Sequence, residues 1–161
     1  MVNNTKGQYK ILLIDDDETI RETLTLLLQD EGYAVDEAET GQEAIKKTNS
    51  NFYNISIVDW RLPDIEGTKL LGDLKHTTPK MAIIMLTGFP SVQNAIESVN
   101  NRADAFFVKP VDLPLLLEKI KELIKQQDES RAFDEAKMVS FIETRAKELM
   151  QIKNNELTAK Q

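Results

Sequence analysis

Five short apolar runs recur along the chain up to residue 108, and four of them are followed by a stretch in which apolar residues repeat with helical spacing before the next run begins. Apolar runs of this length, bounded by turn residues, are typical of strands buried on both faces of a parallel sheet. Because crossovers between parallel strands are right-handed, this alternation predicts an α/β fold, doubly wound as (βα)5, with helices on both faces of the sheet. The predicted strands are 10–14, 33–38, 55–59, 81–86 and 105–108.

The stretches after the strands carry recognisable helix signals. The first helix carries Leu24 and Leu28 on one face and stops near Gly32, a residue that can adopt a left-handed cap. Thr40 and Glu43 have the spacing of a capping box and open the second helix. The third helix passes through residues 69–74, the fourth begins near 90–91 and carries Val92, Ala95, Ile96 and Val99, and the fifth starts at Asp112.

Composition and charge narrow the possible functions. The 161 residues, 41% apolar, suit one domain of ordinary size plus an appendage. The absence of cysteine excludes disulfides and thiolate metal sites. A net charge of −7 argues against direct nucleic-acid binding, because an acidic surface repels phosphate backbones. Residues 1–9 are polar and predict a flexible N-terminus, and no apolar run approaches the roughly 18 residues of a membrane span, so we expect a cytoplasmic protein without membrane contact.

Polar residues stand where four of the predicted strands end. Asp15 and Asp16 follow the first strand, Asp59 ends the third, Thr87 follows the fourth and Lys109 follows the fifth. Open α/β sheets place their ligand crevices at the carboxyl ends of the strands. We therefore expect these five side chains to converge on one crevice.

Three clustered carboxylates repel one another and require a compensating charge. Oxygen ligands of this kind suit Mg²⁺, for which Mn²⁺ can substitute. With a metal in place, Asp59 can act as a carboxylate nucleophile toward phosphorus, while Lys109 neutralises the phosphoryl oxygens and Thr87 donates a hydrogen bond. The predicted chemistry is phosphoryl transfer to an aspartate, followed by hydrolysis of the acyl phosphate.

Four segments of the chain together resemble the receiver domain of two-component response regulators over about residues 10–126. They are Ile11-Leu-Leu-Ile-Asp15-Asp16-Asp17, Val58-Asp59-Trp-Arg-Leu-Pro63-Asp-Ile-Glu-Gly67, Met85-Leu-Thr87-Gly88 and Phe106-Phe-Val-Lys109-Pro110. The resemblance implies a flavodoxin-like fold, similar to that of chemotaxis regulators, with strand order 2-1-3-4-5. It also implies a sensor histidine kinase or phosphotransfer protein as phosphodonor and a downstream protein as target.

The same resemblance implies a role for each site residue. Asp59 is the phosphoacceptor, and the metal is held by Asp15, Asp16, Asp59 and the backbone carbonyl of Arg61. Lys109 and Thr87 complete the reactive set, and Thr87 and Phe106 form the switch. Many members of the family carry tyrosine where this chain has Phe106, so we expect aromatic switching that depends on packing. No enzymatic activity is implied beyond self-phosphorylation and self-dephosphorylation.

The last part of the chain, residues 128–161, predicts an additional C-terminal helix outside a receiver domain at 10–127. Val139, Ile142, Ala146 and Leu149 follow three-four-three spacing. Such a helix can fold back on its receiver, serve as a linker, or pair with a second copy. The resemblance to receiver domains implies, as an alternative, a homodimer through the face formed by the fourth helix, fifth strand and fifth helix. About 34 residues are too few for a DNA-binding output domain of the winged-helix or helix-turn-helix type.

Three functions follow from these observations. The favoured one is a phosphorelay receiver protein that switches protein–protein interactions. A second is the N-terminal receiver-plus-linker part of a longer transcription regulator. A third is a metal-dependent phosphatase with an aspartyl nucleophile, but such enzymes usually need an acid two residues beyond the nucleophile, where this chain has Arg61.

Overall fold

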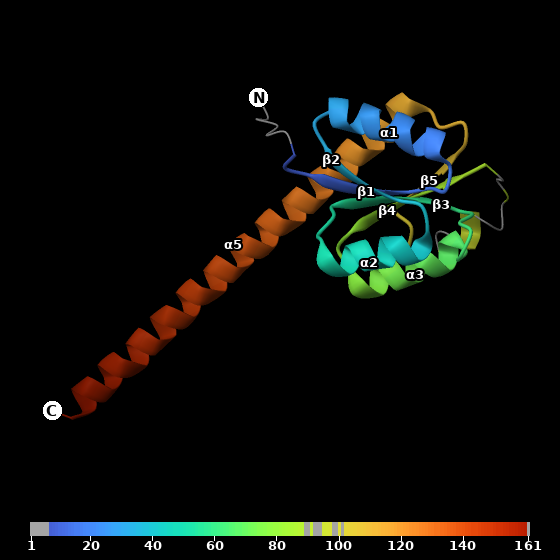
Figure 1. The fold of residues 1–161 in the computed structure, drawn as a ribbon. Helices are drawn as coiled ribbons and strands as arrows, with labels where there is room; N and C mark the ends of the chain where they lie inside the picture. Colours follow the sequence, from blue (N-terminus) through green and yellow to red (C-terminus); the bar gives the residue numbers. More distant parts are fainter. Residues whose placement is uncertain (1–6, 89–90, 92–94, 98–99, 101, 161) are drawn as a thin grey trace. The chain divides into compact units, whose positions relative to one another are not determined.

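The protein is described from a computed structural model, which covers residues 7–88, 91, 95–97, 100 and 102–160. Five strands form a single parallel sheet in the order β2-β1-β3-β4-β5 (Figure 1). This order confirms the α/β fold and the strand arrangement expected from the sequence. The strands are β1 (Lys10–Ile14), β2 (Ala34–Ala38), β3 (Ile55–Asp59), β4 (Ala82–Thr87) and β5 (Ala105–Val108).

Helices in the described part of the chain cover both faces of the sheet (Figure 1). Helix α1 (Glu18–Asp30) lies on one face, whereas α2 (Gly41–Ser50) and α3 (Gly67–Thr77) lie on the other (Figure 1). The central strands β3 and β4 are buried along their whole length, and residues 11–14 of β1 are fully buried. The core is therefore built around apolar strands with helices on both sides, as continuous apolar runs predict.

The predicted helix-end signals at Gly32 and Thr40 are confirmed, and Asp17 adds a further cap. The Asp17 carboxylate accepts a hydrogen bond from the Ile20 N–H at 3.1 Å and caps α1. Gly32 follows α1 with φ of 98°, the left-handed conformation that glycine adopts without strain. At α2, Thr40 Oγ1 accepts from the Glu43 N–H at 3.1 Å. Local sequence thus sets where these two helices begin and where α1 ends.

The fourth predicted helix lies largely outside the described residues. Residues 95–97 and 100, which the structure does describe, are helical. Val92 and Val99, two of the four apolar residues that predicted this helix, lie outside the described part.

The C-terminal helix is confirmed, but it is not a separate sixth helix. Helix α5 runs without a break from Leu113 to Ala159, a length of 47 residues. The segment 121–130 contains neither proline nor glycine and is rich in lysine, glutamate and glutamine, which favour helix, so nothing ends α5 there. The chain divides into two compact units, Met1–Lys121 and Glu122–Gln161.

No helix in the described part of the chain combines the length and apolar character that crossing a bilayer requires.

Two glycines of α3 give a matched test of how closely this helix packs against the backbone of Asp59 and Trp60. A Cβ on Gly67 would lie 2.8 Å from the Trp60 carbonyl oxygen and 2.9 Å from the Asp59 carbonyl oxygen, whereas a Cβ on Gly72 would meet nothing within 4 Å. We expect Gly67→Ala to lower the free energy of unfolding by more than about 1 kcal/mol because backbone must move. Gly72→Ala should raise it by roughly 0.5–1 kcal/mol through helix propensity. Urea denaturation measures both, and equal effects of the two changes would contradict the prediction.

Candidate functional site

Asp15, Asp16 and Asp59 meet at the carboxyl ends of β1 and β3. Ile14 pairs with Val58, so the next residue on each strand, Asp15 and Asp59, is brought alongside its neighbour. One carboxylate oxygen from each of the three acids lies within 4.8 Å of the others. Asp15 and Asp59 are 1% and 8% exposed, whereas Asp16 is exposed. The strand that follows β1 along the chain is β2, on the opposite side of β1 from β3, so this cluster lies at the topological switch point of the sheet.

Lys109 brings a positive charge to the same point from the end of β5. Its Nζ lies 2.8 Å from Asp15 Oδ2 and 3.4 Å from Asp59 Oδ1. Burial lowers the pKa of Lys109, but the hydrogen bond and charge of Asp15, together with those of Asp59, raise it above its ordinary value overall. Lys109 is therefore protonated at neutral pH, and it offsets carboxylate charge but has no lone pair to offer a metal.

The pKa of Asp59 is raised from 3.8 to about 6. Burial is the main cause and the charge of Asp15 the second, while Lys109 and the N–H of Arg61 act in the opposite direction. A carboxylate that lacks full compensation for its charge is a group that gains from a nearby cation. Asp59 thus has the electrostatic environment of a reactive group rather than of a solvated surface acid.

Thr87 and Phe106 reach the site from β4 and β5. Asp59 pairs with Leu86, which places the buried Thr87 one residue beyond the acid on the neighbouring strand. The partly buried Phe106 ring packs edge to face with Trp60, with ring centroids 6.4 Å apart and an interplanar angle of 78°. Phe106 therefore contacts the residue that immediately follows Asp59, and its role as a switch stays a prediction.

The loop after Asp59 is held in place by backbone contacts at both ends. The Trp60 N–H donates to the Leu86 carbonyl at 2.8 Å, and the Gly67 N–H donates to the Trp60 carbonyl at 2.8 Å. Arg61, whose carbonyl the family resemblance assigns to the metal, forms an isolated antiparallel bridge with Glu66. These contacts limit the freedom of the segment that carries the Arg61 carbonyl.

Asp64, in the same loop, was not among the residues predicted from the sequence. Its two carboxylate oxygens accept hydrogen bonds from the N–H groups of Gly41 and Gln42, each at 2.9 Å, so the loop caps the N-terminus of α2. Burial raises the pKa of Asp64, but hydrogen bonds from the N–H groups of Gly41, Gln42, Asp64 and Ile65 together outweigh burial and hold this pKa below its ordinary value. Gly41 leaves room for the loop, since a Cβ there would lie 2.0 Å from Ile65 Cγ2.

Arg21 is a second residue that the sequence patterns did not single out. This buried side chain of α1 donates from Nη1 to the Asp15 carbonyl at 2.8 Å and from Nη2 to Glu39 Oε1 at 2.9 Å. Arg21 therefore fixes the backbone position of Asp15, a candidate metal ligand, and adds positive charge near the acids. An arginine within an amphipathic helix gives no local signal of such burial.

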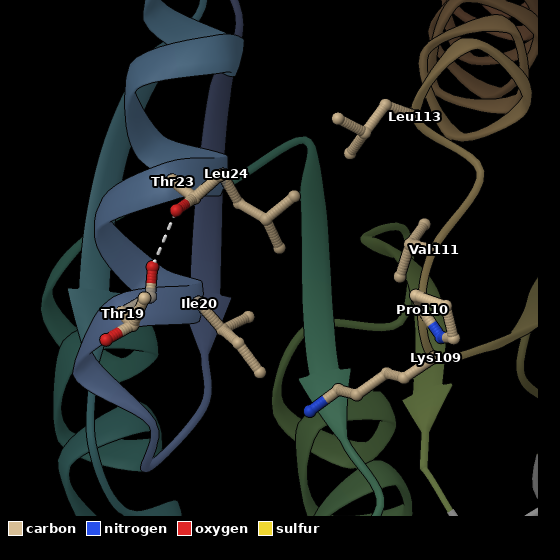
Figure 2. A pocket seen from close by; sticks show the side chains of 8 residues that line it. All are labelled: Thr19, Ile20, Thr23, Leu24, Lys109, Pro110, Val111 and Leu113. Carbon is tan, nitrogen blue, oxygen red and sulfur yellow. Dashed lines mark hydrogen bonds between the residues drawn. The ribbon is translucent and has the colours of Figure 1, made fainter.

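A pocket of about 470 Å³ opens beside Lys109, between α1 and the segment that joins β5 to α5 (Figure 2). Apolar side chains from both elements line most of it, and the Lys109 side chain enters at one end (Figure 2). The lining residues are Thr19, Ile20, Thr23, Leu24, Lys109, Pro110, Val111 and Leu113. The cluster of carboxylates around Lys109 thus adjoins a mostly apolar recess.

Residues 11–121 match the sequence model of the response regulator receiver domain. The chain belongs to this family. A solved receiver domain (CheY-like) from Methanospirillum hungatei JF-1 is 41% identical, with a TM-score of 0.74, over 76% of this chain and 98% of that one. The receiver domain of NtrC4, solved as a beryllofluoride-activated dimer, is 31% identical, with a TM-score of 0.70, over 73% of this chain and 98% of that one.

Two transcriptional regulatory proteins that this chain resembles in sequence are longer than the chain. The transcriptional regulatory protein ResD of Bacillus subtilis is 32% identical over 80% of this chain and 53% of its own length. The transcriptional regulatory protein GlrR of Escherichia coli is 32% identical over 72% of this chain and 26% of its own length. The chain therefore spans about half or less of the length of these two regulators.

The raised pKa of Asp59 has a consequence for stability without metal. Because the folded receiver holds the Asp59 proton more tightly than the unfolded chain does, raising the pH from about 4 to 6 progressively destabilises it. With EDTA present, Asp59→Asn should therefore increase the free energy of unfolding at pH 7 by up to about 3 kcal/mol relative to the unaltered protein. Urea denaturation at several pH values measures this, and the gain should shrink toward zero near pH 4. A gain that does not depend on pH would contradict the assignment.

The Asp64 cap can be separated from general stabilisation of α2. Asp64→Ala and Thr40→Ala each remove a side-chain cap from the same helix end and should each cost about 1 kcal/mol of unfolding free energy. Only Asp64 also holds the loop that carries the Arg61 carbonyl. We expect Asp64→Ala to weaken Mg²⁺ binding several-fold in calorimetric titration and Thr40→Ala to leave it unchanged. Equal Mg²⁺ affinities for the two variants would show that Asp64 acts on α2 alone.

Proposed function

We propose that this receiver accepts a phosphoryl group on Asp59 in a Mg²⁺-dependent reaction and thereby switches its binding to other proteins. One observation carries the proposal: the carboxylates of Asp15, Asp16 and Asp59 converge within 4.8 Å, and Lys109 Nζ contacts two of them. Membership of the receiver family supports the same assignment. The roles of the individual residues are part of the proposal.

The donor set suits a hard divalent cation. Three carboxylates at one point, two of them buried, offer oxygen ligands and an excess of negative charge that Lys109 alone does not offset. We assign the cation to Asp15, Asp16, Asp59 and the Arg61 carbonyl, and Mn²⁺ can replace Mg²⁺ there. When bound, the cation supplies positive charge against the phosphoryl oxygens and lowers the repulsion among the acids.

The transfer itself is carried by Asp59. A carboxylate oxygen attacks phosphorus, and a new O–P bond forms as the bond between phosphorus and the donor's leaving group breaks. With a phosphohistidine donor the leaving group is the imidazole. We assign to Lys109, whose Nζ lies 3.4 Å from Asp59 Oδ1, the pairing with one phosphoryl oxygen, and to the Thr87 hydroxyl a hydrogen bond to another. Attack by water on the acyl phosphate later returns the Asp59 carboxylate and inorganic phosphate.

A protein phosphodonor fits the surface next to the site. The pocket between α1 and the β5–α5 segment is mostly apolar and adjoins Lys109 (Figure 2). A sensor histidine kinase or phosphotransfer protein that inserts an apolar side chain there would bring its histidine close to Lys109 and Asp59. Catalysis by the receiver is confined to its own phosphorylation and dephosphorylation, because the acceptor is one of its own side chains.

A second candidate function is that of a receiver module within a longer transcription regulator. The observation that favours it is coverage: the chain spans 53% of ResD and 26% of GlrR, both named as transcriptional regulatory proteins. In that case the helix after residue 121 joins the receiver to further domains. Phosphorylation chemistry at Asp59 is the same in both candidates.

Intact-protein mass spectrometry with a small phosphodonor, such as acetyl phosphate, tests the proposal. In the presence of Mg²⁺ the protein should gain one phosphoryl group, and EDTA should abolish the gain. Asp59→Ala should gain none, and Lys109→Ala should react at least about a hundredfold more slowly, because a charge that stabilises the transferred group is lost. Asp73→Asn, which removes an exposed acid on α3, serves as the control and should react normally. Normal phosphorylation of Asp59→Ala would overturn the assignment.

A further inference from the structure

We propose that the C-terminal part of α5 pairs with a second copy of itself in antiparallel orientation, centred near Thr144. The pairing surface is a stripe of six residues that follow alternating four-three spacing, here called the C-terminal stripe. It consists of Glu135, Val139, Ile142, Ala146, Leu149 and Lys153. The proposal goes beyond phosphoryl chemistry and does not depend on Asp59.

The C-terminal stripe lies on an apolar face that is exposed in the single chain. Val139, Ile142 and Leu149 are 54%, 57% and 52% exposed. Met138 and Met150, which flank the stripe, are 61% and 67% exposed. Residues spaced by four and three lie on one side of a helix because each residue turns the chain by about 100°. Apolar surface gathered in this way marks a site of association.

A line of polar residues runs along the opposite side of the same helix. Its residues follow the same four-three spacing and are all exposed: Ser140, Thr144, Lys147, Gln151, Asn154 and Thr158. Between residues 138 and 158 the helix thus carries a polar line opposite the stripe, and the exposed Phe141 and Ile152 lie between the two. A helix in a protein gains most of its stability by packing its apolar face against another element.

Charge at the two ends of the stripe identifies the partner and its direction. The apolar part is bounded by Glu135 on one side and Lys153 on the other, each nine residues from Thr144. In an antiparallel pair, Glu135 of one copy faces Lys153 of the other, and this ion pair forms twice. In a parallel pair in register, Glu135 faces Glu135 and Lys153 faces Lys153, which places like charges together within the seam. The charges of the stripe are thus complementary to those of a second copy that runs in the opposite direction.

Side-chain sizes follow the same symmetry. Reversal about Thr144 places Val139 against Leu149 and the larger Ile142 against the small Ala146. Large residues facing small ones allow two helices to interlock at close range. The three largest apolar residues of the stripe, Val139, Ile142 and Leu149, are each more than half exposed in the single chain, as are Met138, Met150 and Leu157 beside them, so pairing would remove apolar surface from water. Charge and packing therefore select the same arrangement.

Charge reversal in the full-length protein tests the pairing and its direction. Sedimentation velocity over a range of concentrations should show a monomer–dimer equilibrium for the unaltered chain. Glu135→Lys and Lys153→Glu should each weaken the dimer at least about tenfold, because each change creates two like-charge contacts. The double variant should recover an affinity close to that of the unaltered protein. Lys147→Glu, a charge reversal on the polar face, should have no effect.

Each alternative to antiparallel pairing predicts a different set of dimer affinities for these variants. A parallel dimer would retain like-charge contacts in the single and double variants alike, so the double variant would bring no specific recovery. A monomer at all concentrations up to about 100 µM would show that the stripe folds back on its own chain or binds another protein, and would overturn the proposal. Circular dichroism of each variant shows whether α5 has stayed helical. The same dimer in Asp59→Ala would separate this proposal from phosphorylation.

Disulfide trapping provides a second, direct test, since the chain has no cysteine of its own. Glu135→Cys and Lys153→Cys are oxidised separately and as an equal mixture. An antiparallel pair should cross-link in the mixture and not in either variant alone. Cross-linking of each variant with itself would indicate parallel pairing and contradict the proposal. Absence of any cross-link, with dimers absent in sedimentation, would do the same.

Discussion

The arrangement of this receiver depends on keeping Asp15 and Asp59 side by side out of water. Two buried carboxylates in adjacent strands repel, and each loses hydration, so their proximity costs free energy unless a cation is near. Lys109 supplies part of the compensation through contacts of 2.8 and 3.4 Å, yet the pKa of Asp59 remains raised to about 6. The site is therefore incompletely neutralised by the protein itself, which is the condition in which a divalent cation and a phosphoryl group can both be accommodated.

Rigid neighbours hold this unfavourable cluster together. Parallel pairing of β1 with β3 fixes the two acids, and Arg21 holds the Asp15 backbone from α1. On the other side, the loop after Asp59 is tied to α2 through Asp64. Strain of this kind persists only where the surrounding structure determines the positions of the groups. The helices beside the sheet thus act on the chemistry through backbone position rather than through side chains that touch the reacting atoms.

Sequence patterns predict the parts of this site that follow from strand polarity. Asp15, Asp59, Thr87 and Lys109 were found because parallel strands bring their carboxyl ends to one edge. Asp64 was missed because its partners, Gly41 and Gln42, are remote in sequence, and no local pattern records a cap supplied from another segment. The single α5 was divided in the prediction at residue 127, although nothing in the sequence there ends a helix. The fold was thus predictable where apolar residues repeat periodically. It was less predictable where it depends on contacts between remote segments or on the lack of a helix-ending residue.

The contact between Gly41 and Ile65 has an evolutionary consequence. A Cβ at position 41 would fall 2.0 Å from Ile65 Cγ2, so a side chain at 41 requires the Ile65 side chain to move or to become smaller. A lineage that acquires alanine or serine at 41 is therefore expected to change its residue at 65 more often than one that keeps glycine at 41. These two sites, far apart along the chain, are therefore expected to covary among relatives that retain the Asp64 cap, and the pair would identify those in which the acceptor loop is anchored to α2.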